Sequence, residues 1–289
     1  MSITVKKNIL LKNLCTIGIG GNAQFYISVN SQEQLLEAFS FVREQGLSFF
    51  VLGKGSNCFF DDRGYVGVII HNKINFCEFN KNKVKVGAGF SFAGLGKKTA
   101  KRNLLGLEYA ACIPASVGGA VFMNAGAEKC NVSCVLESID YITIEGEKKQ
   151  YLAKDFEFDY RYSFLQKLNG AVISSTFILK HSVEAETRQK EMVLKRQKTQ
   201  PLKEKNAGCV FRNPPKTFAG ELIEKCGLKG KKIGDAEVSN KHANFIVNKE
   251  NASSQDMLKL IDLVKKEVFQ KYKIRLREEI RYVPFCEEK

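Results

Sequence analysis

Residues 49–57 read Phe49-Phe50-Val51-Leu52-Gly53-Lys54-Gly55-Ser56-Asn57. The first four are a short apolar run of the kind found in buried strands, and the run ends directly in a loop with two glycines. Glycine lets backbone N–H groups turn toward an anion, and Ser56 and Asn57 add side-chain donors. The stretch therefore predicts a strand that leads into a phosphate-binding loop. Its simpler interpretation is a strand followed by a plain turn.

Helices and further strands flank this loop on both sides. Before it, apolar residues at helical spacing follow Ser31 and stop at Gly46, which predicts a helix. After it, alternating or apolar runs predict strands, and longer amphipathic runs predict helices. We expect strands near 68–70, 84–86, 139–143, 172–179 and 280–283, and helices over 91–102, 185–200 and from 253 or 254. This order predicts an α+β fold in three parts: 1–66, 67–200 and 201–289.

Composition and charge narrow the class of protein. The 289 residues are 44% hydrophobic and 26% charged, which is ordinary for a globular protein and excludes disorder, collagen and coiled coil. Lys and Arg exceed Asp and Glu by 45 − 31 = 14, which favours an anionic partner such as nucleic acid, an anionic membrane or a phosphorylated ligand. The lysines are scattered, however, and most phenylalanines lie in apolar runs. We therefore expect no nucleic-acid partner.

The cysteines and histidines predict no metal site. The nine cysteines have irregular spacings without a CxxC pair, and the three histidines are far apart. No apolar segment with a cleavage site starts the chain, so we expect a cytoplasmic protein with reduced thiols. Residues 109–127 are 19 residues without a charge, close to the length of a membrane span. Pro114 and several glycines make this stretch a ligand loop instead, and we expect no membrane partner.

A second loop of small residues lies within that uncharged stretch. It reads Ile113-Pro114-Ala115-Ser116-Val117-Gly118-Gly119-Ala120, and its small side chains allow a large flat ligand to lie against the backbone. Tight packing of a loop is the alternative. Two such loops favour a cofactor with a pyrophosphate. The pattern GxGxxA at 18–23 is not a Rossmann site, because a strand-like run follows where a helix is required.

Five motifs occur together in an order that resembles one enzyme family. They are Gly53–Asn57, the run 106–127, Tyr160-Arg161-Tyr162-Ser163, Ala207-Gly208-Cys209-Val210-Phe211-Arg212-Asn213-Pro214, and Val238-Ser239-Asn240-Lys241-His242-Ala243-Asn244-Phe245. With Glu279-Ile280-Arg281 at the end, the chain resembles the UDP-N-acetylenolpyruvoylglucosamine reductase family (UDP-N-acetylmuramate dehydrogenase, MurB), in its shorter type II branch. The likeness extends from about Thr16 to Arg281.

The resemblance implies a fold and a reaction. Residues 1–66 and 67–200 would form a two-part FAD-binding module of the vanillyl-alcohol-oxidase (PCMH) type, and 201–289 an α+β substrate-binding domain. A return of the last residues to the first part stays open. The enzyme would use NADPH and FAD to reduce UDP-N-acetylglucosamine enolpyruvate to UDP-N-acetylmuramate in peptidoglycan precursor synthesis. Flavin N5 would give hydride to C3 of the enolpyruvyl group. We expect a monomer.

The resemblance also implies which residues bind. Tyr160, Arg161 and Asn213 would contact the substrate. Arg196 and Lys198 could meet its diphosphate, although a solvated helix face explains them equally well. The cofactor would be bound by residues of the two loops and of the segment that follows the second: Gly53, Lys54, Gly55, Ser56, Asn57, Ile113, Pro114, Ala115, Ser116, Gly118, Gly119, Asn124 and Gly126.

Three residues would be catalytic by the same resemblance. Arg161 would stabilise charge on the substrate carboxylate, with a surface ion pair as the alternative. Glu279 would polarise the same centre, and the neighbouring Glu278 is the competing assignment. Cys209 stands where most of the family has Ser and would give a proton to C2, since a thiol is the stronger acid. The alternative for Cys209 is a covalent nucleophile paired with His242. Another flavin enzyme would lack the Cys209 and Glu279 motifs.

Overall fold

The computed structural model describes residues 2–128 and 130–285, and within them the fold is α+β as predicted. The chain forms two compact units. Unit 1 comprises Met1–Lys6, Phe25–Lys54 and Gly67–Arg196, and unit 2 comprises Lys7–Gln24, Gly55–Val66 and Gln197–Lys289. The division into three parts at residues 66 and 200 stays a prediction.

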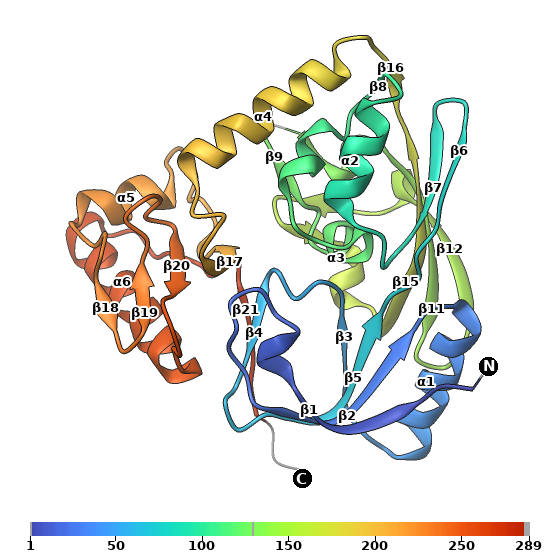
Figure 1. The fold of residues 1–289 in the computed structure, drawn as a ribbon, viewed down its shortest axis with the longest axis horizontal. Helices are drawn as coiled ribbons and strands as arrows, with labels where there is room; N and C mark the ends of the chain where they lie inside the picture. The colour runs from blue at the N-terminus through green and yellow to red at the C-terminus, as the bar shows by residue number, and fades with distance from the viewer. Residues whose placement is uncertain (1, 129, 286–289) are drawn as a thin grey trace. The chain divides into compact units, whose positions relative to one another are not determined.

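Unit 1 is built on an antiparallel sheet of five strands with the order β12-β11-β15-β7-β6 (Figure 1). These are β12 (Lys148–Leu152), β11 (Leu136–Thr143), β15 (Gly170–Ile178), β7 (Lys83–Gly87) and β6 (Cys77–Asn80). One face packs against α2 (Phe92–Ala100), η2 (Glu108–Cys112) and α3 (Val117–Phe122). The uncharged stretch 109–127 therefore contributes buried residues to the core of this unit, while Pro114 and Gly119 are exposed.

Helix α1 (Gln32–Glu44) packs against the other face of that sheet. Its Leu35 and Phe39 lie in one cluster with Ile142 and Ile173 of the five-stranded sheet and with Ile70 of β5. A second sheet, of order β1-β2-β5-β3, contains β1 (Val5–Leu10), β2 (Asn22–Val29), β5 (Tyr65–Asn72) and β3 (Phe49–Leu52). Strand β2 follows the glycines at 18–21, which confirms that they do not open a Rossmann helix.

Unit 2 contains an antiparallel sheet of order β17-β20-β19-β18, with one helix against the sheet and a second helix packed on the first. Its elements are β17 (Lys205–Cys209), β20 (Phe245–Asn248), β19 (Ala236–Val238), β18 (Lys232–Ile233), α5 (Ala219–Lys225) and α6 (Ser254–Tyr272). Helix α6 contacts β18 and β19, and α5 contacts α6. Strand β21 (Arg281–Val283) runs parallel to β4 (Cys58–Phe60). Ser253 caps α6 through a reciprocal pair of hydrogen bonds with Asp256, 3.0 and 2.9 Å long.

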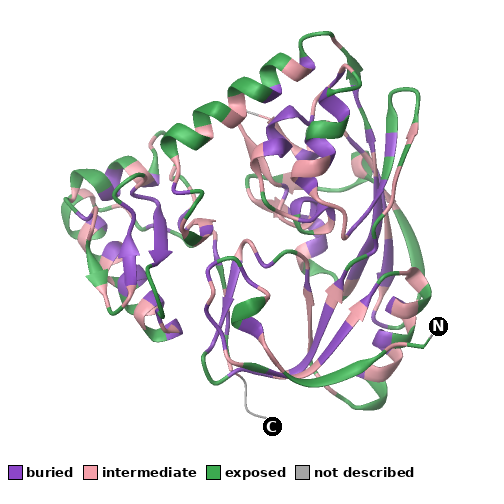
Figure 2. Ribbon diagram, viewed as in Figure 1, coloured by how far each residue is buried: buried purple, intermediate pink, exposed green. Residues whose placement is uncertain are grey.

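One long helix and several short elements complete the chain. Helix α4 (Ala185–Thr199) runs from unit 1 into the first residues of unit 2 and is largely exposed (Figure 2), as its charged sequence predicts. No helix in the described part of the chain is long and apolar enough to cross a membrane. The remaining elements are η1 (Leu11–Asn13), β8 (Leu104–Leu105), β9 (Gly126–Ala127), β10 (Cys130–Asn131), η3 (Val132–Cys134), η4 (Ala153–Asp155), β13 (Phe158–Asp159), β14 (Tyr162–Ser163), η5 (Phe164–Lys167) and β16 (Lys180–His181).

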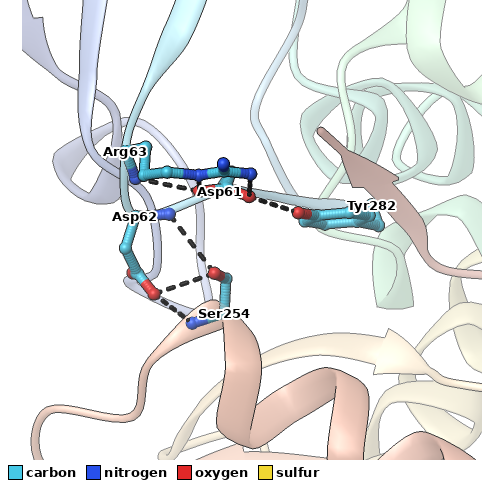
Figure 3. Close-up of polar contacts among 5 residues, drawn as sticks. All are labelled: Asp61, Asp62, Arg63, Ser254 and Tyr282. Carbon is cyan, nitrogen blue, oxygen red and sulfur yellow. Dashed lines mark hydrogen bonds and ion pairs between the residues drawn. The ribbon is translucent and has the colours of Figure 1, made fainter. Parts of the chain in front are cut away.

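Two adjacent carboxylates join distant segments of unit 2 (Figure 3). Asp61 accepts hydrogen bonds from the Arg63 guanidinium at 2.9 and 3.0 Å and from the Tyr282 hydroxyl at 2.5 Å. Asp62 accepts from the backbone N–H and hydroxyl of Ser254, at 2.6 and 2.8 Å, at the start of α6. The Arg63 guanidinium holds the pKa of the buried Asp61 carboxyl well below its usual range.

We expect Asp61 to make unit 2 sensitive to acid. Because the folded state lowers its pKa, its stabilising effect is complete above about pH 4 and is lost as the pH falls below that value. Asp61→Asn should lower the free energy of unfolding at pH 7 by about 1–3 kcal/mol and flatten its decline in acid. Denaturation followed by circular dichroism measures this, because the chain has no tryptophan. Asp262→Asn, at a side chain that is 77% exposed, is the control; an equal acid response in both variants would contradict the prediction.

Candidate active site

The two loops predicted to bind the cofactor touch within unit 1. Gly53 directly follows β3, and a Cβ atom added at Gly53 would overlap the hydroxyl of Ser116. Ser116 is the N-cap of α3 and pairs with Ser91, whose hydroxyl accepts a hydrogen bond of 2.9 Å from the Lys54 ammonium. Glycine is therefore required at position 53 for this close approach.

The second loop offers backbone donors where the first loop meets it. The N–H groups of Ala115 and Ser116 donate no hydrogen bond to any residue that the structure describes. Gly118 packs on Ala88, to whose carbonyl it donates at 2.8 Å. Ile113 donates to the Ala110 carbonyl at 2.9 Å. Small residues with two unused donors fit the phosphate-bearing part of a dinucleotide, and so the residues present fit FAD.

A half-buried histidine, given no role from the sequence, lies beside the Gly53 loop. His71 of β5 lies opposite Leu52 of β3, the residue before Gly53. Its Nδ1 is 2.9 Å from the Tyr26 hydroxyl. Burial lowers the pKa of His71 to about 4, so the ring is neutral at physiological pH. Its long-range partner on β2 leaves no signal in the local sequence.

Gly53→Ala tests the close approach of the two loops. The added methyl must displace Ser116, and overpacking of this kind typically costs about 1–3 kcal/mol. We expect FAD to bind roughly 5- to 150-fold more weakly, as measured by titration of the apoprotein followed by flavin fluorescence. Gln45→Ala, at the exposed C-cap of helix α1, is the control because it changes a surface side chain of the same unit. Unchanged FAD affinity in Gly53→Ala would remove this loop from the cofactor site.

Arg161 occupies the tip of a hairpin in unit 1. Strands β13 and β14 pair across the two-residue turn Tyr160-Arg161, and Arg161 has a left-handed backbone with φ of +57°. Such a backbone is unusual for a residue with a side chain and often marks a functional position. The guanidinium carbon lies 5.0 Å from the centre of the exposed Tyr160 ring. The two predicted substrate contacts of this unit are thus held side by side.

Asn124 holds that hairpin in place. Its side chain is buried and donates to the Asp159 carbonyl at 2.9 Å while accepting from the Ser133 N–H at 3.0 Å. Gln166 donates to the Arg161 carbonyl at 3.2 Å. Gly126 lies in β9, where a Cβ would overlap the Cys130 carbonyl of the paired strand β10. A cofactor contact of Asn124 or Gly126 stays a prediction, since the contacts seen for both are structural.

In unit 2, the strand that carries Cys209 lies beside the segment that carries Glu279. The Glu279 N–H donates to the carbonyl of Val210, the residue after Cys209, at 2.8 Å. Both Cys209 and Glu279 are half-buried. The neighbouring Glu278 forms an ion pair of 2.8 Å with Lys265. This pair supports Glu279 over Glu278 as the site residue.

Loop residues 55–57 join the same group within unit 2. The Asn57 side chain donates to the Glu279 carbonyl at 3.1 Å, and the Asn57 carbonyl accepts from the Arg281 N–H at 3.0 Å. Gly55 has φ of +59° and lies against the Leu14 carbonyl, so only glycine fits there. Within the described ranges, no acceptor is bonded to the N–H groups of Gly55, Ser56 and Asn57. Three motifs from distant parts of the chain therefore meet here.

Asn213 and His242 have structural contacts in unit 2. The Asn213 side chain accepts from the N–H of Ala219 at 3.1 Å, where α5 begins. His242 Nδ1 accepts from the Asn244 N–H at 3.2 Å, and its ring lies 4.9 Å from that of Phe245. The substrate contact predicted for Asn213 stays a prediction. No group of three or more potential metal ligands occurs among residues 2–128 and 130–285.

Comparison with known proteins identifies the family. Residues 200–283 match the C-terminal domain of UDP-N-acetylenolpyruvoylglucosamine reductase, and residues 23–149 match an FAD binding domain. The chain is 46% identical over 279 residues to the UDP-N-acetylenolpyruvoylglucosamine reductase of Protochlamydia amoebophila, covering 96% of this chain and 93% of that protein. The chain belongs to the UDP-N-acetylenolpyruvoylglucosamine reductase family.

Further relatives agree. The reductase of Chlamydia felis is 40% identical over 283 residues, which is 98% of this chain and 95% of that one. The crystal structure of UDP-N-acetylenolpyruvylglucosamine reductase (MurB) from Thermus caldophilus has a TM-score of 0.84 at 34% identity, with 98% and 100% of the two chains covered. These matches confirm the predicted family and the α+β fold class, with an FAD binding domain followed by the family's C-terminal domain. The PCMH type of the FAD-binding module stays a prediction. The chain is an FAD-dependent oxidoreductase of peptidoglycan synthesis.

Proposed function

We propose that the chain catalyses the NADPH-dependent, FAD-mediated reduction of UDP-N-acetylglucosamine enolpyruvate to UDP-N-acetylmuramate. The observation that carries this proposal is the backbone contact in unit 2 that holds Glu279 beside the Cys209 strand, 2.8 Å from the Val210 carbonyl. Both residues match positions that the family resemblance makes catalytic. A monomer, a cytoplasmic location and the absence of nucleic-acid or membrane partners stay predictions.

The cofactor-binding role is assigned to residues of each unit. In unit 1, Gly53, Lys54 and the small-residue loop 113–119 would hold FAD, with the Ala115 and Ser116 N–H groups toward phosphate. In unit 2, the N–H groups of residues 55–57 offer the same kind of donor. FAD, when bound, takes hydride from NADPH and supplies it to C3 of the enolpyruvyl group. The protein must stabilise the charge that then develops and deliver a proton.

Arg161 and Glu279 would stabilise the developing charge. Adding hydride to C3 gives carbanion character to C2, and this charge spreads into the adjoining carboxylate. A guanidinium can contact both carboxylate oxygens, and the left-handed turn at Arg161 fixes where the side chain starts. Glu279, as a hydrogen-bonded acid, would polarise the same centre, and its backbone is bonded on both sides by Val210 and Asn57. Tyr160 and Asn213 would contact other parts of the substrate.

Cys209 would complete the reaction as the acid. Its S–H bond breaks as the proton passes to C2, so that hydride and proton together convert the enolpyruvyl C=C bond to the lactyl group. Cys209 is the last residue of β17 and is half-buried. Its backbone pairs with Phe245 of β20, which fixes the strand on that side. A thiol is a stronger acid than the serine hydroxyl that the family resemblance implies at this position. Cys209 can therefore donate the proton to C2.

An anaerobic absorbance experiment tests the proposal. The purified protein, loaded with FAD, receives NADPH and then UDP-N-acetylglucosamine enolpyruvate. We expect the blue flavin band to bleach with NADPH and to return with the sugar. Recovery with oxygen alone would reject the substrate and keep the flavoprotein fold. A protein that binds no FAD would overturn the proposed function.

A further inference from the structure

The segment that carries Cys209 is held along two edges. On one edge, the Val210 carbonyl accepts from Glu279 at 2.8 Å, and the Arg212 N–H donates to the Arg277 carbonyl at 2.9 Å. These two bonds flank a bridge between Phe211 and Glu278. The N–H and C=O of Phe211 therefore point toward the opposite edge. Buried in the core, they require partners there.

One side chain supplies both partners on that second edge. Asn244 is 3% exposed; its Oδ1 accepts from the Phe211 N–H at 3.0 Å, and its Nδ2 donates to the Phe211 carbonyl at 2.8 Å. The Asn244 carbonyl also accepts from the Val210 N–H at 2.8 Å. The carboxamide thus replaces one residue of a neighbouring strand. The Asn244 side chain therefore continues the hydrogen bonding of this edge to Phe211, two residues beyond the pairing of Cys209 with Phe245.

We propose that Asn244 is a positioning residue for the reduction, holding the Cys209 strand in register with Glu279. Its two hydrogen bonds fix the Phe211 peptide groups on one edge while the Val210 carbonyl fixes Glu279 on the other. Loss of the bond to the Phe211 carbonyl lets the segment 209–212 shift against 277–280. The proton donor and Glu279 then no longer keep one fixed separation, and the step that uses them both slows. This inference rests on the proposed function for its kinetic consequence.

The same unit offers a matched control at Asn248. Its side chain is also 3% exposed, accepts from the Ala252 N–H at 2.9 Å and donates to the Ile17 carbonyl at 3.0 Å. Asn244 and Asn248 therefore make the same two kinds of bond at the same burial. Asn248 holds a part of the unit to which no catalytic role is assigned. Changing either asparagine to aspartate turns the donating nitrogen into an oxygen facing a carbonyl, which is unfavourable.

The test compares Asn244→Asp and Asn248→Asp in the FAD-loaded full-length enzyme by stopped flow. For Asn244→Asp we expect flavin reduction by NADPH within about twofold of wild type. Reoxidation by saturating UDP-N-acetylglucosamine enolpyruvate should slow by about tenfold or more, with the half-saturating sugar concentration little changed. Asn248→Asp should leave both half-reactions near the wild-type rates. Asn244→Ser, which replaces the carboxamide with a single neutral hydroxyl, should fall between wild type and Asn244→Asp.

Hydrogen exchange followed by mass spectrometry gives a readout without turnover. The peptide that contains residues 277–280 should exchange about tenfold or more faster in Asn244→Asp and at the wild-type rate in Asn248→Asp. Unchanged exchange at 277–280 in both Asn244 variants, or the same kinetic split in Asn248→Asp, would overturn the positioning role. If wild type itself does not react with the sugar, the proposed function fails, while the exchange comparison still decides whether Asn244 holds Glu279. Should Asn244→Asp fail to fold, Asn244→Ser carries the same two measurements.

Discussion

Cys209→Ala should reduce its flavin with NADPH at the wild-type rate and then stall. The proton for C2 has no donor in this variant, and general acid catalysis typically contributes about 10²- to 10⁴-fold. We therefore expect reoxidation of the flavin by the enolpyruvyl sugar to slow by that factor. Stopped-flow absorbance under nitrogen separates the two half-reactions. The loss should be purely kinetic, because the backbone bonds of β17 do not involve the thiol.

Two further variants make the Cys209 result specific. Cys209→Ser places a hydroxyl acid where the family resemblance implies serine, and it should keep substantial activity. Cys134→Ala removes an exposed thiol of unit 1 and should behave as wild type. If Cys209→Ala were reoxidised at the wild-type rate, the proton would have another donor. If it lost FAD as well, Cys209 would belong to cofactor binding.

Arg161→Ala should give the second largest effect, again confined to reoxidation by the sugar. Removing one fixed donor to a developing negative charge typically costs about 10²- to 10³-fold. Arg161→Lys should recover only part of this loss, since an ammonium cannot contact both carboxylate oxygens at once. Glu279→Gln should likewise slow this half-reaction far more than flavin reduction. Rates come from the same stopped-flow protocol.

The control for Arg161 is Arg188→Ala, which removes an exposed arginine of helix α4 in the same unit. Arg188 forms an i, i+4 ion pair with Glu184 at 2.6 Å, and such surface pairs contribute little. We expect both half-reactions of Arg188→Ala to match wild type. Equal slowing of the two half-reactions in Arg161→Ala would instead place Arg161 in folding or in FAD binding.

Local patterns predicted several elements of both units, but not β17 or β20 beside Cys209. The apolar run Phe49–Leu52 is β3, the charged run at 185–200 is α4, and Ser253 caps α6. Each depends on residues a few positions apart, whose periodicity or capping chemistry is visible in a linear chain. The glycine turn at Gly53 was also visible, because a short apolar run leads directly into it. Its cofactor role stays a proposal, since a plain turn has the same local pattern.

The sequence could not show which motif side chains hydrogen-bond to the protein's own backbone and which would contact a ligand. Asn124 and Asn213 stood within motifs and were predicted to bind ligands, yet the contacts seen for their side chains are to backbone groups. Asn244 stood within a quoted motif without a role. His71 was not singled out at all. A carboxamide or imidazole bonds equally well to a ligand or to a peptide group, so residue type alone cannot separate the two uses.

By itself, the sequence predicted many of the helices and strands, the family motifs, and a cysteine at position 209 where the family resemblance implies serine. Tertiary structure alone decided that Asn57 and Glu279, 222 residues apart, share a hydrogen bond, and that Glu278 turns to Lys265. It also decided that residues 55–66 and 197–289 fold into one unit. The physical reason is that backbone hydrogen bonds pair peptide groups, which are the same in nearly every residue. Which strands meet is therefore set by the packing of the whole chain.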